Sequence, residues 1–276
     1  MALSPDGSHL AILNAAEVPL YEVWVSDLAR GTLTRLTFGK PGEIASTPVW
    51  APDGKRVMYR LQAGDAYKIM WKPADGSGAD ELLLSVNDPI VPLTCSPDGQ
   101  LLVFYRNNQG HRDLWVLPLV GEHKPRPLIE SPFDKVQAQV SPDGRWLAYA
   151  SNESGHPEVY VQPFPGLGGK WQISTTGGAE PLWSRDGRQL FYRSGDKLMV
   201  VEIETKAGFA PGSPHLLFDQ PYAHGGTGGW VANYDVAPDG QHFVMLKEDD
   251  TQSSQLELRV VLNWAEEVTR RLSSGK

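Results

Sequence analysis

The sequence of 276 residues is poor in cysteine, in long apolar runs and in positive charge. Its one cysteine, Cys95, excludes a disulfide within the chain and leaves the redox compartment unassigned. There is no apolar run of about 18 residues and no signal-peptide pattern after Met1, so no membrane insertion of this chain is predicted. Lysine and arginine number 25 against 33 for aspartate and glutamate, a net charge of −8. Nucleic acids and anionic membranes both need a cationic surface, so neither is predicted as a partner.

Known catalytic motifs are also missing. Residues 110–119, GHRDLWVLPL, begin like a protein-kinase catalytic loop, in which an aspartate accepts the substrate proton. Where that pattern needs a magnesium-binding asparagine, this chain has Pro118. The G-x-S-x-G, H-E-x-x-H and paired C-x-x-C patterns are absent as well. We therefore expect neither a kinase nor a serine peptidase.

Turn residues are abundant, with Gly 28 and Pro 22, and they recur with a period. The tetrapeptide Ser/Ala-Pro-Asp-Gly occurs five times and Ser-Arg-Asp-Gly once, at spacings of 47, 45, 45, 43 and 53 residues. The aspartates of these copies are Asp6, Asp53, Asp98, Asp143, Asp186 and Asp239. Proline fixes φ, aspartate bonds the nearby backbone and glycine supplies a positive φ, so each copy is predicted to be a turn rather than an ion site.

Short strands are predicted around each turn. One strand ends in the turn, as in TPVWAPDG, a nearly continuous apolar strand such as RWLAYAS follows, and a third and fourth bring the chain back. Apolar residues on both faces of a strand indicate that both faces are covered. Four antiparallel strands per unit, stacked between neighbours, are typical of a β-propeller. We predict an all-β fold with six four-stranded antiparallel blades in a single domain, residues 1–276.

The two ends of the chain deviate from this repeat. The first unit begins only three residues before its turn, and the last unit has no clear fourth strand. Because unpaired edge strands promote aggregation, the incomplete ring leaves open that the chain is part of a longer polypeptide. Asn263 and Glu266 form a capping-box pattern ahead of apolar residues spaced four apart, which predicts a short docked helix over 264–272.

The repeat resembles the WD-like repeat of TolB-type proteins, in which SPDG marks the turn between the first two strands of each blade. The segment YASNESGHPEVYVQPF and the terminal VVLNW are similar to the C-terminal propeller of bacterial membrane-anchored serine/threonine kinases. That resemblance implies a sensor or interaction module outside the membrane, with a kinase domain and a transmembrane helix upstream. It implies the fold more strongly than any chemistry, since propellers host unrelated functions.

The candidate site is the mouth of the central channel on the side away from the SPDG turns, where loops bring histidines and carboxylates together. Candidate ligand-binding residues are His111, His156, Glu180, His224, Trp230 and Asp235. Candidates to hold a divalent cation, calcium or zinc, are Glu180, His224, Asn233 and Asp235. The alternative is that these are channel polar groups bonded to water and backbone. The glycine-rich link 220–232 is either a lid over the mouth or a solvated insertion.

Two functions follow from these features. The first is a non-catalytic binding or sensor module that recognises a protein, peptide or small ligand at the channel mouth and needs no cofactor. The alternative is a metal-assisted hydrolase of esters, lactones or phosphoesters, in which a channel cation lowers the pKa of water. Alignment on the turns places Asp113 and Glu158 at one position of the third strand, and predicts that Cys95 is buried and unreactive.

Overall fold

The computed structural model describes residues 1–17, 20–108, 110–166, 168–206, 208–223, 229, 231–247 and 260–261. Within these ranges every element with described bounds is a β-strand, which confirms the predicted all-β class. The helix predicted over 264–272 lies outside the described residues, as do His224 and Trp230.

Two antiparallel meanders begin the chain. The first contains β1 (Ala2–Leu3), β2 (His9–Glu17), β3 (Leu20–Asp27) and β4 (Thr32–Arg35), and the second contains β5 (Glu43–Trp50), β6 (Arg56–Ala63), β7 (Ala66–Pro73) and β8 (Glu81–Val86). Within each meander every strand pairs with the next. One parallel pair, Tyr21 with Ile44, joins the two meanders into a single hydrogen-bonded sheet.

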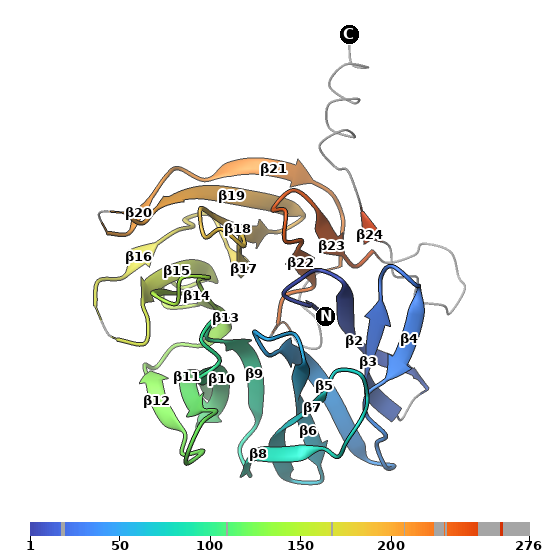
Figure 1. Cartoon of the computed structure of the whole chain (residues 1–276). Helices are drawn as coiled ribbons and strands as arrows, with labels where there is room; N and C mark the ends of the chain where they lie inside the picture. Colours follow the sequence, from blue (N-terminus) through green and yellow to red (C-terminus); the bar gives the residue numbers. More distant parts are fainter. Residues whose placement is uncertain are drawn as a thin grey trace.

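Separate sheets follow around a central axis (Figure 1). They comprise β9 (Ile90–Cys95), β10 (Leu101–Asn108), β11 (His111–Pro118) and β12 (Arg126–Ile129); β13 (Lys135–Val140), β14 (Trp146–Ser151), β15 (Glu158–Pro163) and β16 (Trp171–Gln172); β17 (Ala179–Trp183), β18 (Gln189–Ser194), β19 (Lys197–Glu204), β20 (Ala210–Pro211) and β21 (His215–Asp219); and β22 (Tyr234–Val236), β23 (Phe243–Met245) and β24 (Val260–Val261). The first strand of each sheet lies innermost, so these strands surround the axis (Figure 1).

The apolar core lies between neighbouring sheets. All six residues of β14 are buried, as expected for a strand covered on both faces. One core cluster joins Val103 and Leu114 of the β9–β12 sheet to Leu147 and Tyr149 of the β13–β16 sheet. The nearly continuous apolar strands that the sequence predicted are therefore explained by stacking of one sheet on the next.

The repeated turns have the predicted geometry. Their glycines have φ between 66° and 74°, which L side chains rarely adopt, as in Gly54 (66°) and Gly7 (74°). In the first copy the Ser4 hydroxyl donates to Asp6 Oδ1 (2.6 Å), and the Ser8 N–H donates to the same oxygen (3.0 Å). These hydrogen bonds, with that of Ser4 the largest cause, lower the pKa of Asp6 to about 2. The turn aspartates thus serve the backbone, as the sequence predicted.

Consecutive turns touch one another through proline and glycine. A Cβ built on the glycine would lie within 4.0 Å of the proline of a neighbouring turn in these pairs: Pro5 with Gly54, Pro52 with Gly99, Pro97 with Gly144, Pro142 with Gly187, and Pro238 with Gly7. The last pair joins the final turn to the first. We refer to this set of contacts as the turn ring.

The first and last sheets also meet through their inner strands. The Leu3 N–H in β1 donates to Asp235 Oδ2 in β22 (2.7 Å), and Leu3 and Leu10 pack with Val244 of β23. Figure 1 shows the N-terminus beside β22. Short as it is, β1 therefore closes the circle of sheets by pairing with β2 on one side and contacting β22 on the other.

Candidate functional site

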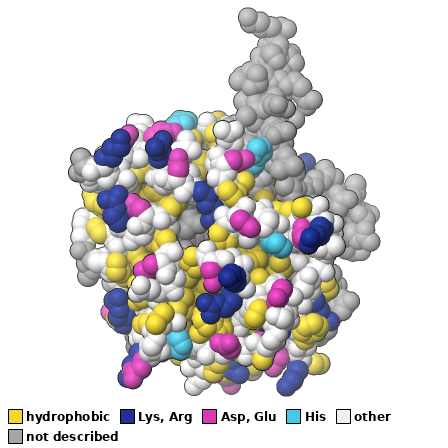
Figure 2. Space-filling view, in the orientation of Figure 1, with side chains coloured by type: hydrophobic (Ala, Val, Ile, Leu, Met, Phe, Trp, Pro, Cys, Tyr) yellow, Lys and Arg dark blue, Asp and Glu magenta, His cyan; other side chains and the backbone are white. Residues whose placement is uncertain are grey.

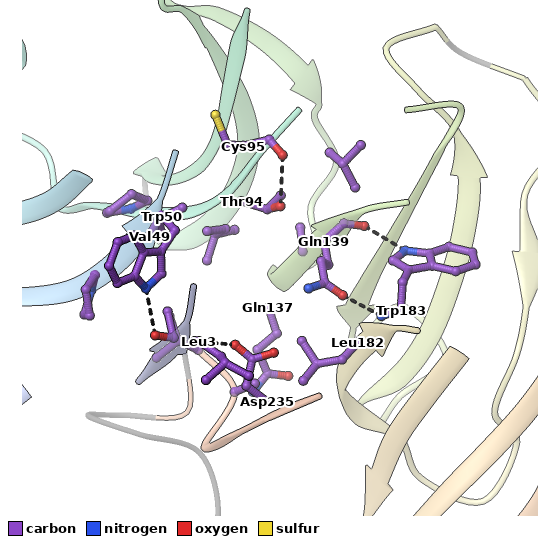
Figure 3. Close-up of a pocket in the computed structure, with 18 of the residues that line it drawn as sticks. Leu3, Val49, Trp50, Thr94, Cys95, Gln137, Gln139, Leu182, Trp183 and Asp235 are labelled. Carbon is purple, nitrogen blue, oxygen red and sulfur yellow. Dashed lines mark hydrogen bonds between the residues drawn. The ribbon is translucent and has the colours of Figure 1, made fainter. Parts of the chain in front are cut away.

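A cavity of about 390 Å³ lies on the central axis. Residues of β1, β5, β9, β13, β17 and β22 line it, and Figure 3 shows Thr94, Gln139 and Asp235 arriving from three of these strands. Most of the lining is apolar or proline. The polar side chains among it are Thr47, Thr94, Gln137, Gln139, Arg185, Tyr234 and Asp235.

Three inner strands share an uncommon backbone conformation. Thr47, Gln137 and Glu180 have φ of 51°, 55° and 56°, and each stands six residues before the aspartate of its turn. The strand register shifts beside each of them, as in a β-bulge. Bulges re-aim side chains and are frequent at functional sites. The same bulge thus recurs in three units and directs polar groups toward the axis.

Gln137 and Glu180 connect three of the sheets. Gln137 Oε1 accepts from the Glu180 N–H (2.8 Å), and Gln137 Nε2 donates to the carbonyl of Gly229 (2.8 Å). Glu180 Oε2 accepts from the Asn233 N–H (3.0 Å), while the Tyr234 hydroxyl donates to the Glu180 carbonyl (2.8 Å). These bonds hold the segment before β22 against the inner strands. Asn233, predicted as a metal ligand, uses its backbone here.

Thr47 differs from its two counterparts. The residue is 5% exposed and lies in the cavity wall, and its buried Oγ1 has no hydrogen-bond partner in the described part of the chain. A β-branched residue at positive φ is strained, and an unsatisfied buried hydroxyl costs about 1–3 kcal/mol. The backbone strain and the unsatisfied hydroxyl are therefore both found at Thr47, in the cavity wall.

Asp235 presents a carboxylate to the same cavity. Oδ2 accepts from Leu3 and Oδ1 accepts from the Val236 N–H (2.8 Å). Burial raises the pKa of Asp235, and the positive charge of Arg185 and these two N–H groups act in the opposite direction. Among the lining side chains, Asp235 is the acidic one and Arg185 the basic one.

The two candidate histidines lie away from this cavity. His111 Nε2 is 3.4 Å from Asp113 Oδ2, and Lys135 Nζ donates to Asp113 Oδ1 (2.9 Å) with both partners nearly fully buried. Ser131 N–H also donates to Asp113 (3.2 Å). The kinase-like residues 110–119 therefore contribute Asp113 to a structural ion pair with Lys135.

Glu158 repeats the arrangement one unit later. It is fully buried, accepts from the Gly177 N–H (3.0 Å) and from the Ser174 hydroxyl, and lies 3.2 Å from His156 Nδ1. The prediction that Asp113 and Glu158 occupy one position is confirmed, since each fixes the segment that follows the fourth strand. His111 and His156 neighbour these buried carboxylates and do not line the cavity.

The structure thus places some of the candidate site residues near the axis and others away from it. Glu180, Asn233 and Asp235 lie together near the axis, and Asp235 alone of them lines the cavity. In the described residues no three His, Cys, Asp or Glu side chains are grouped to hold one metal ion. Sequence reasoning missed Thr47, Gln137, Gln139 and Arg185. The available signal was the recurrence of polar residues at fixed distances before the turn aspartates.

Cys95 corrects one prediction in part. It is partly rather than fully buried, because it occupies the position of Trp50 and Trp183 with a much smaller side chain and lines the cavity. Burial raises the pKa of the Cys95 thiol to about 12, which disfavours the reactive thiolate.

The chain was compared with protein families, with curated protein sequences and with solved structures, and the solved structures alone gave matches. No protein-family model and no curated protein sequence matches the chain. No helix within the described ranges has the length and apolarity needed to cross a membrane.

Solved structures give clear matches. TolB from Acinetobacter baumannii superposes with a TM-score of 0.70 at 19% identity, over 89% of this chain and 59% of that protein. A TolB structure from Agrobacterium tumefaciens gives 0.61 at 19% identity, over 79% of both chains. An oligogalacturonate lyase in complex with manganese gives 0.55 at 14% identity, over 89% and 84%. The chain therefore spans about three fifths of the first of these proteins.

Such low identities establish the fold alone, and the resemblance to kinase-linked propellers stays a prediction. The repeat of turns, the sheets around one axis and these structural neighbours agree: the chain is a β-propeller, with a fold similar to that of TolB.

Proposed function

We propose that residues 1–276 form a single six-bladed propeller that binds a small molecule or a short peptide in its central cavity without transforming it. The six turns and the six inner strands support the blade count. A cavity of about 390 Å³ falls in the range of small-ligand sites, which is about 300–1,000 Å³.

The observation that carries this proposal is Thr47. A strained conformation with a buried, unpartnered hydroxyl persists only where the surrounding structure imposes it, and such residues cluster at ligand sites. A rotation about χ1 that brings the buried hydroxyl to the cavity surface would let a bound ligand with a polar group give Thr47 Oγ1 its missing hydrogen bond. Gln139, whose Oε1 accepts from the Trp183 N–H (2.6 Å), and Thr94 would supply further polar contacts on other sides of the cavity (Figure 3).

The wall suits binding better than chemistry. Thr47, Thr94 and the glutamines are neutral, and the Cys95 thiol has a pKa too high for a nucleophile. The predicted role as a sensor or interaction module of a longer protein is consistent with a cavity of this kind. TolB propellers share the fold at 19% identity, which supports the architecture of the proposed binding module but does not identify its ligand.

The alternative function is a metal-assisted enzyme. A neighbouring lyase is solved with manganese, and Asp235 presents a carboxylate to the cavity. Calcium, zinc or manganese bound by Asp235 would lower the pKa of a coordinated water and make it a nucleophile. Metal content of the purified protein, together with hydrolysis of ester, lactone and phosphoester panels, separates this alternative from the binding proposal.

A thermal-shift screen tests the binding proposal. Organic acids, amino acids, tripeptides and sugars are added singly to the wild type and to Thr47→Val, which removes the hydroxyl and keeps the shape. We expect at least one compound to raise the melting temperature of the wild type and to act at least about tenfold more weakly on the variant, which lacks one buried hydrogen bond.

Two results would overturn the proposal. One is that every compound found in the screen acts equally on the wild type and on Thr47→Val. The other is stoichiometric metal in the purified protein, with hydrolysis that is lost on Asp235→Ala and kept on Thr47→Val.

A further inference from the structure

One turn of the repeat departs from the others in a single residue. Five copies have proline before the aspartate, and the copy at 184–187 has Arg185. Proline fixes φ for this turn, so its replacement forgoes preorganisation that the other copies have. The Ser184 hydroxyl still donates to Asp186 Oδ1 (2.7 Å) and Gly187 keeps φ of 70°. Arginine is therefore not required by the turn geometry.

The turn ring lacks one contact at this residue, because Arg185 does not touch the glycine of the next turn as the prolines do. The turn that follows Arg185 contains Gly240, and a Cβ built there would meet no atom within 4 Å. A second cavity, of about 490 Å³, lies at this junction, between residues of β18, β19 and the turns at 184–187 and 237–240. Arg185 lines both this junction cavity and the central cavity. The side chain thus stands where the two spaces adjoin.

The acidic groups of the junction cavity have partners from the protein. Asp186 accepts from the Arg188 N–H (3.0 Å), Glu202 accepts from Gln189 Nε2 (2.8 Å), and Asp239 accepts from the Gln241 N–H (2.9 Å). Asp186 Oδ2 also lies 3.9 Å from Arg188 Nε. These local bonds account for the carboxylates at the rim.

The guanidinium of Arg185 makes weaker interactions than these carboxylates do. Its NH2 donates to the Ser4 carbonyl at 3.5 Å, and in the described residues no carboxylate oxygen lies within 4.0 Å of it. Asp235, on the axis side, acts on it at longer range. A guanidinium carries five donors in a planar fork that fits a carboxylate with two parallel hydrogen bonds. Arg185 is exposed and lines the junction cavity, and the bond to Ser4 is the one hydrogen bond that its guanidinium makes within the described residues.

We propose that Arg185 is a recognition residue, which binds the carboxylate of a ligand at the turn-side opening of the channel. The carboxylate belongs either to a small organic acid or to the C-terminus of a peptide that enters the cavity. This inference rests on the proposed function and adds a chemical class and a direction of entry. On the face shown in Figure 2, described acidic and basic side chains are interspersed. Selection of a carboxylate ligand would therefore depend on the planar guanidinium of Arg185 rather than on a large positively charged surface.

The repeat itself supplies the test variant. Arg185→Pro restores the sequence of the other turns and is expected to fold and to melt at or above the wild-type temperature. Arg185→Lys keeps the charge and loses the fork. Arg188→Gln removes a neighbouring charge from the same cavity and is the matched control. The probes are glutarate and Ala-Ala-Ala with a free or an amidated C-terminus, at constant ionic strength.

The readout is the NMR signal of the Arg185 Nε–H group. We expect saturable shifts with glutarate or with the free-acid tripeptide, and none with the amide. Calorimetry with the same probe should show binding weakened about tenfold or more in Arg185→Pro, partly restored in Arg185→Lys, and unchanged in Arg188→Gln. Glutarate alone identifies a small acid as the ligand class, and the free-acid tripeptide identifies a peptide terminus.

Other outcomes contradict the inference. These are no saturable shift with either acid, equal affinity in Arg185→Pro, or an equal loss in Arg188→Gln. If a compound from the thermal-shift screen binds Arg185→Pro normally and Thr47→Val poorly, the inference about Arg185 fails while the proposed function stands.

Discussion

At the scale of single residues, a few buried polar side chains have a large effect on the free energy of unfolding. Thr47 combines positive φ with an unpartnered hydroxyl, and Asp113 with Lys135 forms an ion pair that is nearly fully buried. The Thr47 hydroxyl makes no hydrogen bond within the described residues, whereas the ion pair anchors the segment before β13. Substitutions at the two places should therefore shift stability in opposite directions.

Replacing Thr47 by glycine should stabilise the protein. Glycine accepts φ of 51° without strain and removes the unsatisfied hydroxyl, so the free energy of unfolding should rise by about 1 kcal/mol. Thr94→Gly is the matched control, because Thr94 lines the same cavity and is not among the residues with positive φ. Urea unfolding of both variants checks this. Equal destabilisation of the two would mean that Thr47 is not strained.

Replacing Asp113 by asparagine should destabilise the protein strongly. The change keeps the shape and leaves Lys135 charged and buried, which costs about 3–5 kcal/mol. Glu122→Gln, in an exposed pair with Lys124, should change the free energy of unfolding by less than about 0.5 kcal/mol. Urea unfolding measures both. A loss below about 1 kcal/mol for Asp113→Asn would contradict a structural role for the pair.

At the scale of elements, the turn is the repeated unit of this fold. Its backbone conformation was predictable from four residues, because proline, aspartate and glycine act locally. The contact between one turn and the next was not, since it depends on the placement of whole sheets. Pro238 against Gly7 is the clearest case, because the two residues are separated by almost the whole chain.

Gly7→Ala should therefore cost more than an alanine at an isolated turn. Gly7 has φ of 74°, and a Cβ there would lie 2.6 Å from Pro238 Cδ, whereas Gly31 has φ of 65° and nothing within 4 Å. Both alanines carry the strain of positive φ, and only Gly7→Ala adds a clash. Thermal melting should show a clearly larger drop for Gly7→Ala. Equal drops would mean that the turn ring does not close there.

The turns should also govern acid stability. The pKa of Asp6 is about 2 in the folded protein, below its usual value in an unfolded chain of about 3.9. A depressed carboxyl pKa contributes stability above the unfolded value, and that contribution is lost as pH falls toward the folded value. The melting temperature should thus fall between about pH 4 and pH 2. Asp6→Asn should flatten this dependence, and an unchanged slope would contradict it.

At the scale of the whole molecule, the sequence predicted the all-β propeller fold, whereas it did not predict the residues that line the central cavity. The turns, the order of strands and the all-β class follow from local patterns and their period. The cavity wall does not, because it contains positive-φ bulges at Thr47, Gln137 and Glu180, residue types for which a local pattern predicts an ordinary extended strand. Residue type drew attention to His111 and His156, which lie beside buried carboxylates and do not line the cavity. Their role at the channel mouth stays a prediction.

The most direct test of the central claim is a methyl NMR titration of the wild type. Thr47, Thr94 and Ala138 line the cavity, whereas Thr32 and Thr34 lie on the outer strand β4. The account predicts that a compound found in the thermal-shift screen shifts the three cavity methyl signals saturably and leaves the two on β4 unchanged. Saturable binding with unperturbed cavity methyl signals would contradict it.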